Sequence, residues 1–67
     1  MATAEEIRDV LKSAGWSLGE FATPGGWHVE GTRGEAHIRG EGTTPAVAWH
    51  RVALAALLLP ADATLRA

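Results

Sequence analysis

The chain has 67 residues, with six Lys or Arg against eight Asp or Glu, a net charge of −2 and no cysteine. A chain this short holds one domain and buries only about 60% of the surface that it exposes when unfolded, so we expect self-association to add stability. The lack of cysteine excludes disulfide bonds and thiolate zinc sites, and the basic residues are scattered singly, which argues against a nucleic-acid partner.

The first predicted element is a helix that begins at Thr3. Thr3 and Glu6 fit a capping box, in which each side chain accepts a hydrogen bond from the other residue's backbone N–H. Apolar residues then recur at i, i+3, i+4 and i+7 and form one stripe: Ile7, Val10, Leu11 and Ala14. Gly15 suits the left-handed position just past the helix end.

Three strands should follow this helix. Apolar residues in segment 16–23 alternate as in a strand, except that Phe21 falls on the opposite face from the others. A bulge at Gly19 would return Phe21 to the inner face. Residues 23–26 read Thr-Pro-Gly-Gly and predict a hairpin turn, with a positive φ at Gly25. Segments 27–31 and 35–41 alternate cleanly between apolar and polar residues, and residues 31–34 connect them.

A second helix is predicted after a short loop. Thr44 is a good N-cap, Pro45 suits the first helical position, and Pro60 should end the helix. Residues 61–67 have no pattern, and we expect a frayed tail. The prediction is therefore one α+β domain over residues 1–60, ordered helix, three-stranded antiparallel sheet, helix, with both helices on one face of the sheet.

The second helix carries two apolar stripes, and one sheet cannot cover both. The stripe expected to face the sheet contains Pro45, Trp49, Val52, Ala53, Ala56 and Leu59. On nearly the opposite side lie Val47, Leu54 and Leu58, with Arg51 among them and His50 and Leu57 at one edge. Either Val47 and Leu54 pack against the first helix, or this side is an interface.

If this side is an interface, a second copy or another protein is favoured over a small molecule, because small residues would let another backbone come close: Ala46, Ala48, Ala53, Ala55 and Ala56. Its predicted residues are Val47, His50, Arg51, Leu54 and Leu58, and its expected occupant is a second copy or another protein.

The polar face of the sheet is a second candidate surface. A symmetric turn over residues 31–34 would place His28 opposite His37 and Glu30 opposite Glu35, with Arg39 beside them. These side chains suit zinc, although no spacing signature of a zinc site accompanies them. The simpler interpretation is a solvated or partner-recognising face, with no metal and no cofactor, whose histidines make binding depend on pH.

Residues for covalent catalysis are scarce. The chain has no Cys and no Tyr, and neither Ser13 nor Ser17 has a nucleophile context. Glu41 and His50 could form an acid–base pair, but a loop carboxylate and a surface histidine explain them more simply. Trp16, Trp27 and Trp49 are expected to fill the core. We expect no enzyme.

The N-terminus and the apolar run near the C-terminus bear on location. The first ten residues are acidic where a signal peptide would be basic and then apolar. Residues 45–59 are fewer than the roughly 20 needed to cross a bilayer. We therefore expect a cytoplasmic protein without a membrane partner.

Residues 40–57 resemble the closing half of double-stranded-RNA-binding domains, where a glycine-containing loop leads into an Ala-rich helix. That family places lysines at the start of the helix, where this chain has only Pro45, Ala46, Val47 and Ala48. The resemblance implies the topology and offers nucleic-acid binding as an alternative function.

A second group of residues resembles the small phage alpha-beta-alpha sandwich domains. The matching features are Thr44-Pro45, Ala48, Arg51, Ala53-Leu54 and Gly26-Trp27. This resemblance implies a phage or prophage accessory protein in the bacterial cytoplasm. Its expected activity is to bind and block a host factor, including one of a defence system.

Overall fold

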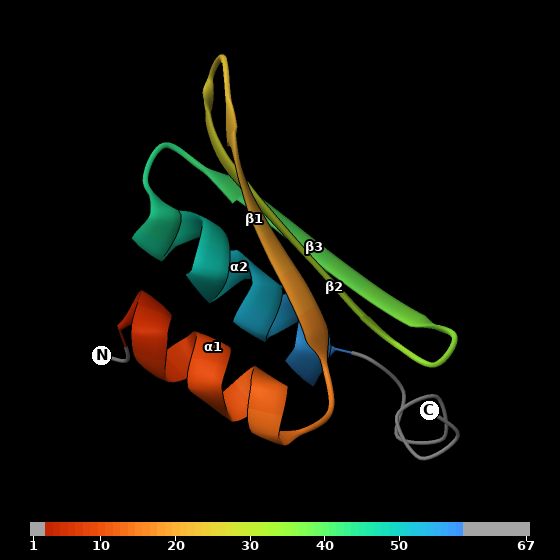
Figure 1. Cartoon of the computed structure of the whole chain (residues 1–67). Coiled ribbons are helices and arrows are strands. Elements are labelled where there is room, and N and C mark those ends of the chain that lie inside the picture. The colour runs from red at the N-terminus through yellow and green to blue at the C-terminus, as the bar shows by residue number, and fades with distance from the viewer. Residues whose placement is uncertain (1–2, 59–67) are drawn as a thin grey trace.

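The computed structural model describes residues 3–58 and contains five elements in the expected order, with both helices on one face of the sheet (Figure 1). They are α1 (Ala4–Ser13), β1 (Ser17–Thr23), β2 (Gly26–Arg33), β3 (Ala36–Gly42) and α2 (Pro45–Leu57). The predicted α+β class is confirmed. Leu59, the expected helix end at Pro60 and the predicted tail lie outside the described residues.

The first helix begins and ends as predicted. Thr3 Oγ1 accepts from the N–H of Glu6 at 3.1 Å, and Glu6 Oε1 accepts from the N–H of Thr3 at 3.2 Å. At the other end, Gly15 has φ 96° and the N–H of Trp16 donates to the carbonyl of Leu11 at 3.0 Å. This is a Schellman ending, which brings Trp16 and Leu11 together.

The sheet is antiparallel with strand order β1-β2-β3. Thr23 pairs with Gly26, so the first hairpin turns where predicted, although the positive φ falls on Gly26 (149°) and not on Gly25.

The predicted register of the second hairpin is wrong. Arg33 pairs with Ala36, and Glu30 lies opposite Arg39 and not opposite Glu35. The turn is centred on Gly34, which has φ 59°, as a two-residue hairpin turn requires. Because the register differs by an even number of residues, each side chain keeps its predicted face.

Gly31 explains why the hairpin turns later than expected. It lies in the ladder opposite Ile38, and a Cβ there would come 2.8 Å from Leu18 Cδ2 and 3.1 Å from Ile38 Cγ1. The missing side chain is therefore needed for packing between the strands and not for a turn.

The bulge predicted at Gly19 is also absent from the structure. Strand β1 pairs regularly with β2, which places Glu20 on the inner face opposite Val29 and Phe21 on the outer face opposite His28. The Phe21 ring lies over Gly19, where a Cβ would stand 2.9 Å from Phe21 Cζ. Because Gly19 has no side chain, the outward-facing ring of Phe21 can pack directly on its backbone.

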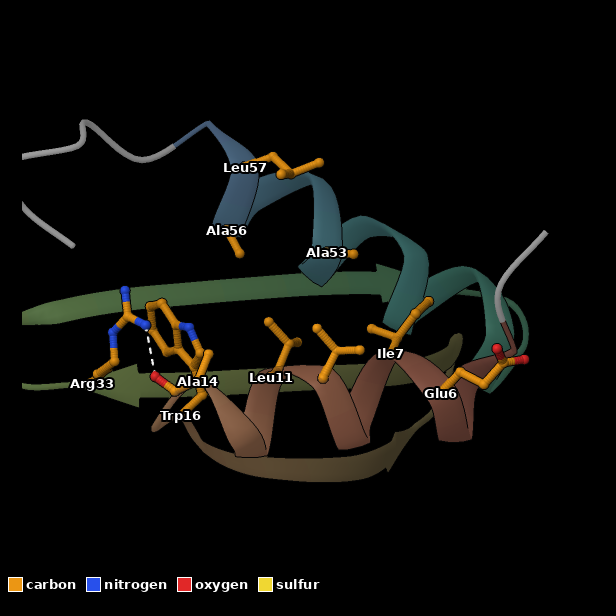
Figure 2. Close-up of a pocket in the computed structure, with 10 residues that line it drawn as sticks. Glu6, Ile7, Leu11, Ala14, Trp16, Arg33, Ala53, Ala56 and Leu57 are labelled. Atoms are coloured by element: carbon orange, nitrogen blue, oxygen red, sulfur yellow. Dashed lines mark hydrogen bonds between the residues drawn. The ribbon is translucent and has the colours of Figure 1, made fainter. Parts of the chain in front are cut away.

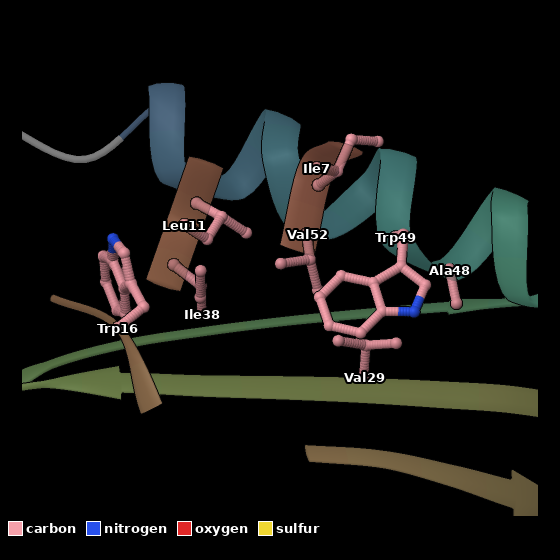
Figure 3. Packing of buried hydrophobic residues seen from close by; sticks show 8 residues of the cluster. All are labelled: Ile7, Leu11, Trp16, Val29, Ile38, Ala48, Trp49 and Val52. Atoms are coloured by element: carbon pink, nitrogen blue, oxygen red, sulfur yellow. The ribbon is translucent and has the colours of Figure 1, made fainter. Parts of the chain in front are cut away.

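The core lies between the helices and the inner face of the sheet (Figure 3). Its buried residues are Ile7, Leu11, Trp16, Val29, Ile38, Ala48, Trp49 and Val52. Trp16 and Trp49 are core residues as predicted, whereas Trp27 is only half-buried at the margin.

Helix α2 lies almost against the backbone of β3. A Cβ on Gly40 would come 2.6 Å from the carbonyl oxygen of Ala48 and 2.7 Å from the amide nitrogen of Val52. A Cβ on Gly42 would come 2.5 Å from Val47 Cγ1. The small side chain of Ala48 therefore allows a close contact with a backbone, as its size suggested. That backbone is β3 of the same chain and not a partner.

Candidate protein-binding surface

Five large aliphatic side chains of the two helices are exposed, and four of them are more than half exposed. Val10 is 68% exposed, Leu54 59%, Leu57 80% and Leu58 83%. We call these residues the helix-layer patch. Scattered exposed aliphatic residues are common on protein surfaces, but neighbouring ones mark sites of association.

The patch follows from how the two helices turn toward the core. In α1, Ile7 and Leu11 are buried, which leaves Val10 on the side toward α2. In α2, Ala48, Trp49 and Val52 take the buried side. With about 100° between successive residues, Leu54 and Leu58 must then point away from the sheet.

The residues predicted for the interface have different surroundings. Leu54 and Leu58 are exposed, so Leu54 does not pack inward against α1. Val47 is 37% exposed and rests on Gly42, His50 is half-buried, and Arg51 is exposed. Val10 was not predicted for this surface and Leu57 was placed only at its edge, because their exposure depends on where α1 lies beside α2.

A groove of about 460 Å³ runs between the helices next to the patch (Figure 2). Its lining is mainly apolar: Ile7, Val10, Leu11 and Ala14 from α1, Ala53, Ala56 and Leu57 from α2, and Trp16. Its two charged residues are Glu6 and Arg33, which lie at opposite ends (Figure 2). The groove is therefore an apolar channel with an acidic end and a basic end.

Arg33 is held in place at the basic end. Its guanidinium lies 4.7 Å from the centroid of the Trp16 ring, and Nη1 donates to the carbonyl oxygen of Ala14 at 2.8 Å. Its Nε is buried without a hydrogen-bond partner among residues 3–58. Stacking on an aromatic ring and a bond to a helix C-terminus both favour a fixed guanidinium.

The outer face of the sheet carries a smaller polar cluster. His28 Nε2 donates to Glu30 Oε1 at 2.8 Å, and His28 Nδ1 lies 4.0 Å from Glu41 Oε1. The hydrogen bond from His28 lowers the pKa of the Glu30 carboxyl below its ordinary value of 4.5; desolvation opposes this effect, and the charges of His28, His37 and Arg39 add to it.

Several predictions for this face need correction. His28 pairs with Glu41 and His37 with Thr32, so the two histidines are not opposite each other, and Glu35 lies in the β2–β3 turn. Glu41 lies opposite His28 in the ladder, which brings Glu41 Oε1 to 4.0 Å from His28 Nδ1. Within residues 3–58 no three His, Asp or Glu side chains come together as a metal site would require.

Two features of the sheet were missed because a bulge was predicted at Gly19. Phe21 is 53% exposed beside His28, with 6.3 Å between the ring centroids. Glu20 accepts a hydrogen bond from Trp49 Nε1 at 2.7 Å. Both follow from the regular parity of β1, which faces Glu20 inward and Phe21 outward.

Comparisons with family models, with curated proteins and with solved structures found no match to this chain. In the part of the chain that the structure describes, neither helix is long and apolar enough to cross a membrane.

Proposed function

We propose that this chain is a non-enzymatic protein-binding module that associates through the helix-layer patch. The observation that carries the proposal is the exposure of Val10, Leu54, Leu57 and Leu58, all between 59% and 83%, beside an apolar groove. Burying an aliphatic side chain of this size contributes about 1.5–3 kcal/mol. A partner that covers the patch therefore binds with a large favourable free energy from the burial of apolar surface.

The side chains around the patch favour binding over chemistry. The groove is lined by aliphatic, alanine and tryptophan side chains, and its charged residues Glu6 and Arg33 lie at opposite ends. A nucleophile and its activating base need to lie within hydrogen-bonding distance of one another. This arrangement supports recognition of an apolar partner.

The resemblance to phage domains suggests a class of foreign partner. We propose that the module binds and blocks a host protein in the bacterial cytoplasm, with the outer face of the sheet as the second surface. That face presents Phe21 beside His28, with Glu30 and Arg39 adjacent. An aromatic residue among hydrogen-bonding groups is a composition common in protein interfaces.

Nucleic-acid binding is the alternative that the sheet and helix order suggested. Binding to phosphates draws on clustered Lys and Arg. The first turn of α2 is Pro45, Ala46, Val47 and Ala48, and no cation stands there. We therefore keep protein binding as the proposed function.

The proposal is tested by Leu54→Glu, with Thr32→Glu on the outer face of the sheet as the matched control. Leu54→Glu places a charge within the patch and should abolish association while the circular dichroism spectrum stays unchanged. Thr32→Glu adds the same charge on the exposed opposite side and should leave association intact. Molar mass by light scattering after size exclusion reads out both variants. A Leu54→Glu protein that still forms the associated species seen for Thr32→Glu would reject the patch.

A further inference from the structure

We infer that the helix-layer patch is covered by a second copy of this chain, packed antiparallel so that the groove of one copy runs opposite to the groove of the other. The inference rests on the proposed function and names the partner of the same surface. It follows from the direction of the helices, from the two charged ends of the groove and from the area of the molecule.

The two helices of one chain point in the same direction. Three antiparallel strands joined by tight turns separate them, and Figure 1 shows both running toward the same end of the sheet. Their dipoles therefore add, with roughly half a positive charge at each N-terminus and half a negative charge at each C-terminus. Helix α2 has no acidic residue in its first turn and no basic residue in its last turn, so its own side chains do not offset these charges.

The charged residues of the groove follow the same axis. Glu6 lies at the end where the helices begin, and Arg33 lies at the end where they finish, next to Ala14 and Trp16 (Figure 2). One copy of the surface is thus acidic at one end and basic at the other, with aliphatic residues between.

An antiparallel second copy complements this pattern. A twofold axis that lies in the plane of the patch and perpendicular to the groove reverses the groove of the partner. Glu6 of each copy then faces Arg33 of the other, and the helix dipoles of the two copies oppose each other. An axis along the groove would instead place each Glu6 near the other Glu6, with parallel dipoles.

The size of the molecule limits where such an interface can lie. A standard interface takes about 800 Å² from each partner, which is a large share of the 4518 Å² that this chain exposes. A twofold interface uses the same residues on both sides, so each exposed leucine is buried by its counterparts. The result is a four-layer assembly in which the helices of both copies lie between two sheets.

Single cysteines test the orientation, since the chain has none of its own. Glu6→Cys and Ala14→Cys place thiols on the groove side of α1, two turns apart. Equal amounts of the two variants are mixed, treated with a short bismaleimide cross-linker and separated by mass. The antiparallel dimer predicts that the mixed product, with position 6 joined to position 14, exceeds the combined amount of the two products of identical chains, because random pairing alone makes these amounts equal.

Thr32→Cys serves as the control, because it lies on the outer face of the sheet and should give no cross-link. A product of two Glu6→Cys chains that dominates the mixture would overturn the antiparallel arrangement, yet the proposed function would stand if Leu54→Glu still abolished association. A protein that stays monomeric would overturn the inference that a second copy covers the patch. The patch would then be left to a foreign protein or to residues 59–67. Association that persists in Leu54→Glu would instead reject the proposed surface itself.

Discussion

Trp49 joins the two layers of the molecule through both packing and a hydrogen bond. Its side chain is buried over Val29 of β2 (Figure 3), and its Nε1 donates to Glu20 Oε1 on the edge strand at 2.7 Å. A buried indole N–H needs a partner, and a carboxylate is a strong one. This hydrogen bond also links β1 to α2.

Replacing Glu20 by Ala should therefore lower the free energy of unfolding by about 1–3 kcal/mol, because Trp49 Nε1 loses a charged acceptor. Urea denaturation followed by tryptophan fluorescence measures this change. Glu35→Ala is the matched control, since Glu35 lies exposed in the β2–β3 turn and should change stability by no more than about 0.5 kcal/mol. Equal losses in the two variants would show that the hydrogen bond contributes nothing.

Glu30 predicts a pH dependence of stability. The hydrogen bond from His28 lowers the pKa of Glu30 in the folded protein below its ordinary value of 4.5. A lowered folded-state pKa contributes stability at pH values above the ordinary one, and this contribution is lost as the pH falls through the lowered value. Wild type should therefore lose more stability than Glu30→Gln as the pH falls below 4.5.

Thermal melts across this acidic range compare the two proteins. Glu35→Gln, which removes a carboxylate from the turn, should follow the wild-type pH profile more closely than Glu30→Gln does. Parallel profiles for wild type and Glu30→Gln would contradict the assignment of this contribution to Glu30.

At the scale of elements, the contact between α2 and β3 depends on glycine. The backbone of α2 at Ala48 and Val52 lies so close to Gly40 that a methyl group there has no flexible side chain to displace. The helix itself would have to move. Overpacking of this kind typically costs about 1–3 kcal/mol.

Gly40→Ala should accordingly destabilise the fold by about that amount and shift α2 away from the sheet. Gly25→Ala is the control, because no atom lies within 4 Å of its added Cβ and Gly25 does not adopt a positive φ. That variant should be neutral or stabilised by up to about 1 kcal/mol through the unfolded state. Denaturant midpoints measure both changes, and a Gly40→Ala protein as stable as Gly25→Ala would refute the close contact.

Elements specified by local interactions were predictable from the sequence. The capping box of Thr3 and Glu6, the left-handed Gly15 and the Thr44–Pro45 helix start each involve neighbours in the chain. The second hairpin was not predictable, because the choice between Gly31 and Gly34 as the turn residue depends on Leu18, which belongs to another strand.

The candidate surface divides in the same way. Helical periodicity alone placed Leu54 and Leu58 away from the sheet, and both are exposed. The exposure of Val10 and the groove beside Leu57 depend on where α1 lies relative to α2, and the periodicity of a single helix contains no such information. The faces on which the β1 side chains lie were likewise predicted wrongly, so the roles of Glu20 and Phe21 were missed.

At the scale of the whole molecule, a small two-layer domain has one face of each layer exposed to solvent. The sheet presents a polar ladder with Phe21, whereas the helices present the helix-layer patch and the groove between Glu6 and Arg33. A chain this short has few apolar residues to spare. Their placement on the outside of the helices supports the proposal that a partner covers them.

The molar mass of the wild-type chain over a series of micromolar concentrations, measured beside Leu54→Glu, is the most direct test of whether a second copy covers the patch. Burial of the patch by a second copy predicts a wild-type mass that rises to that of two chains, while Leu54→Glu remains a folded monomer. A wild-type protein that stays monomeric throughout, or a Leu54→Glu protein that associates as wild type does, would contradict it.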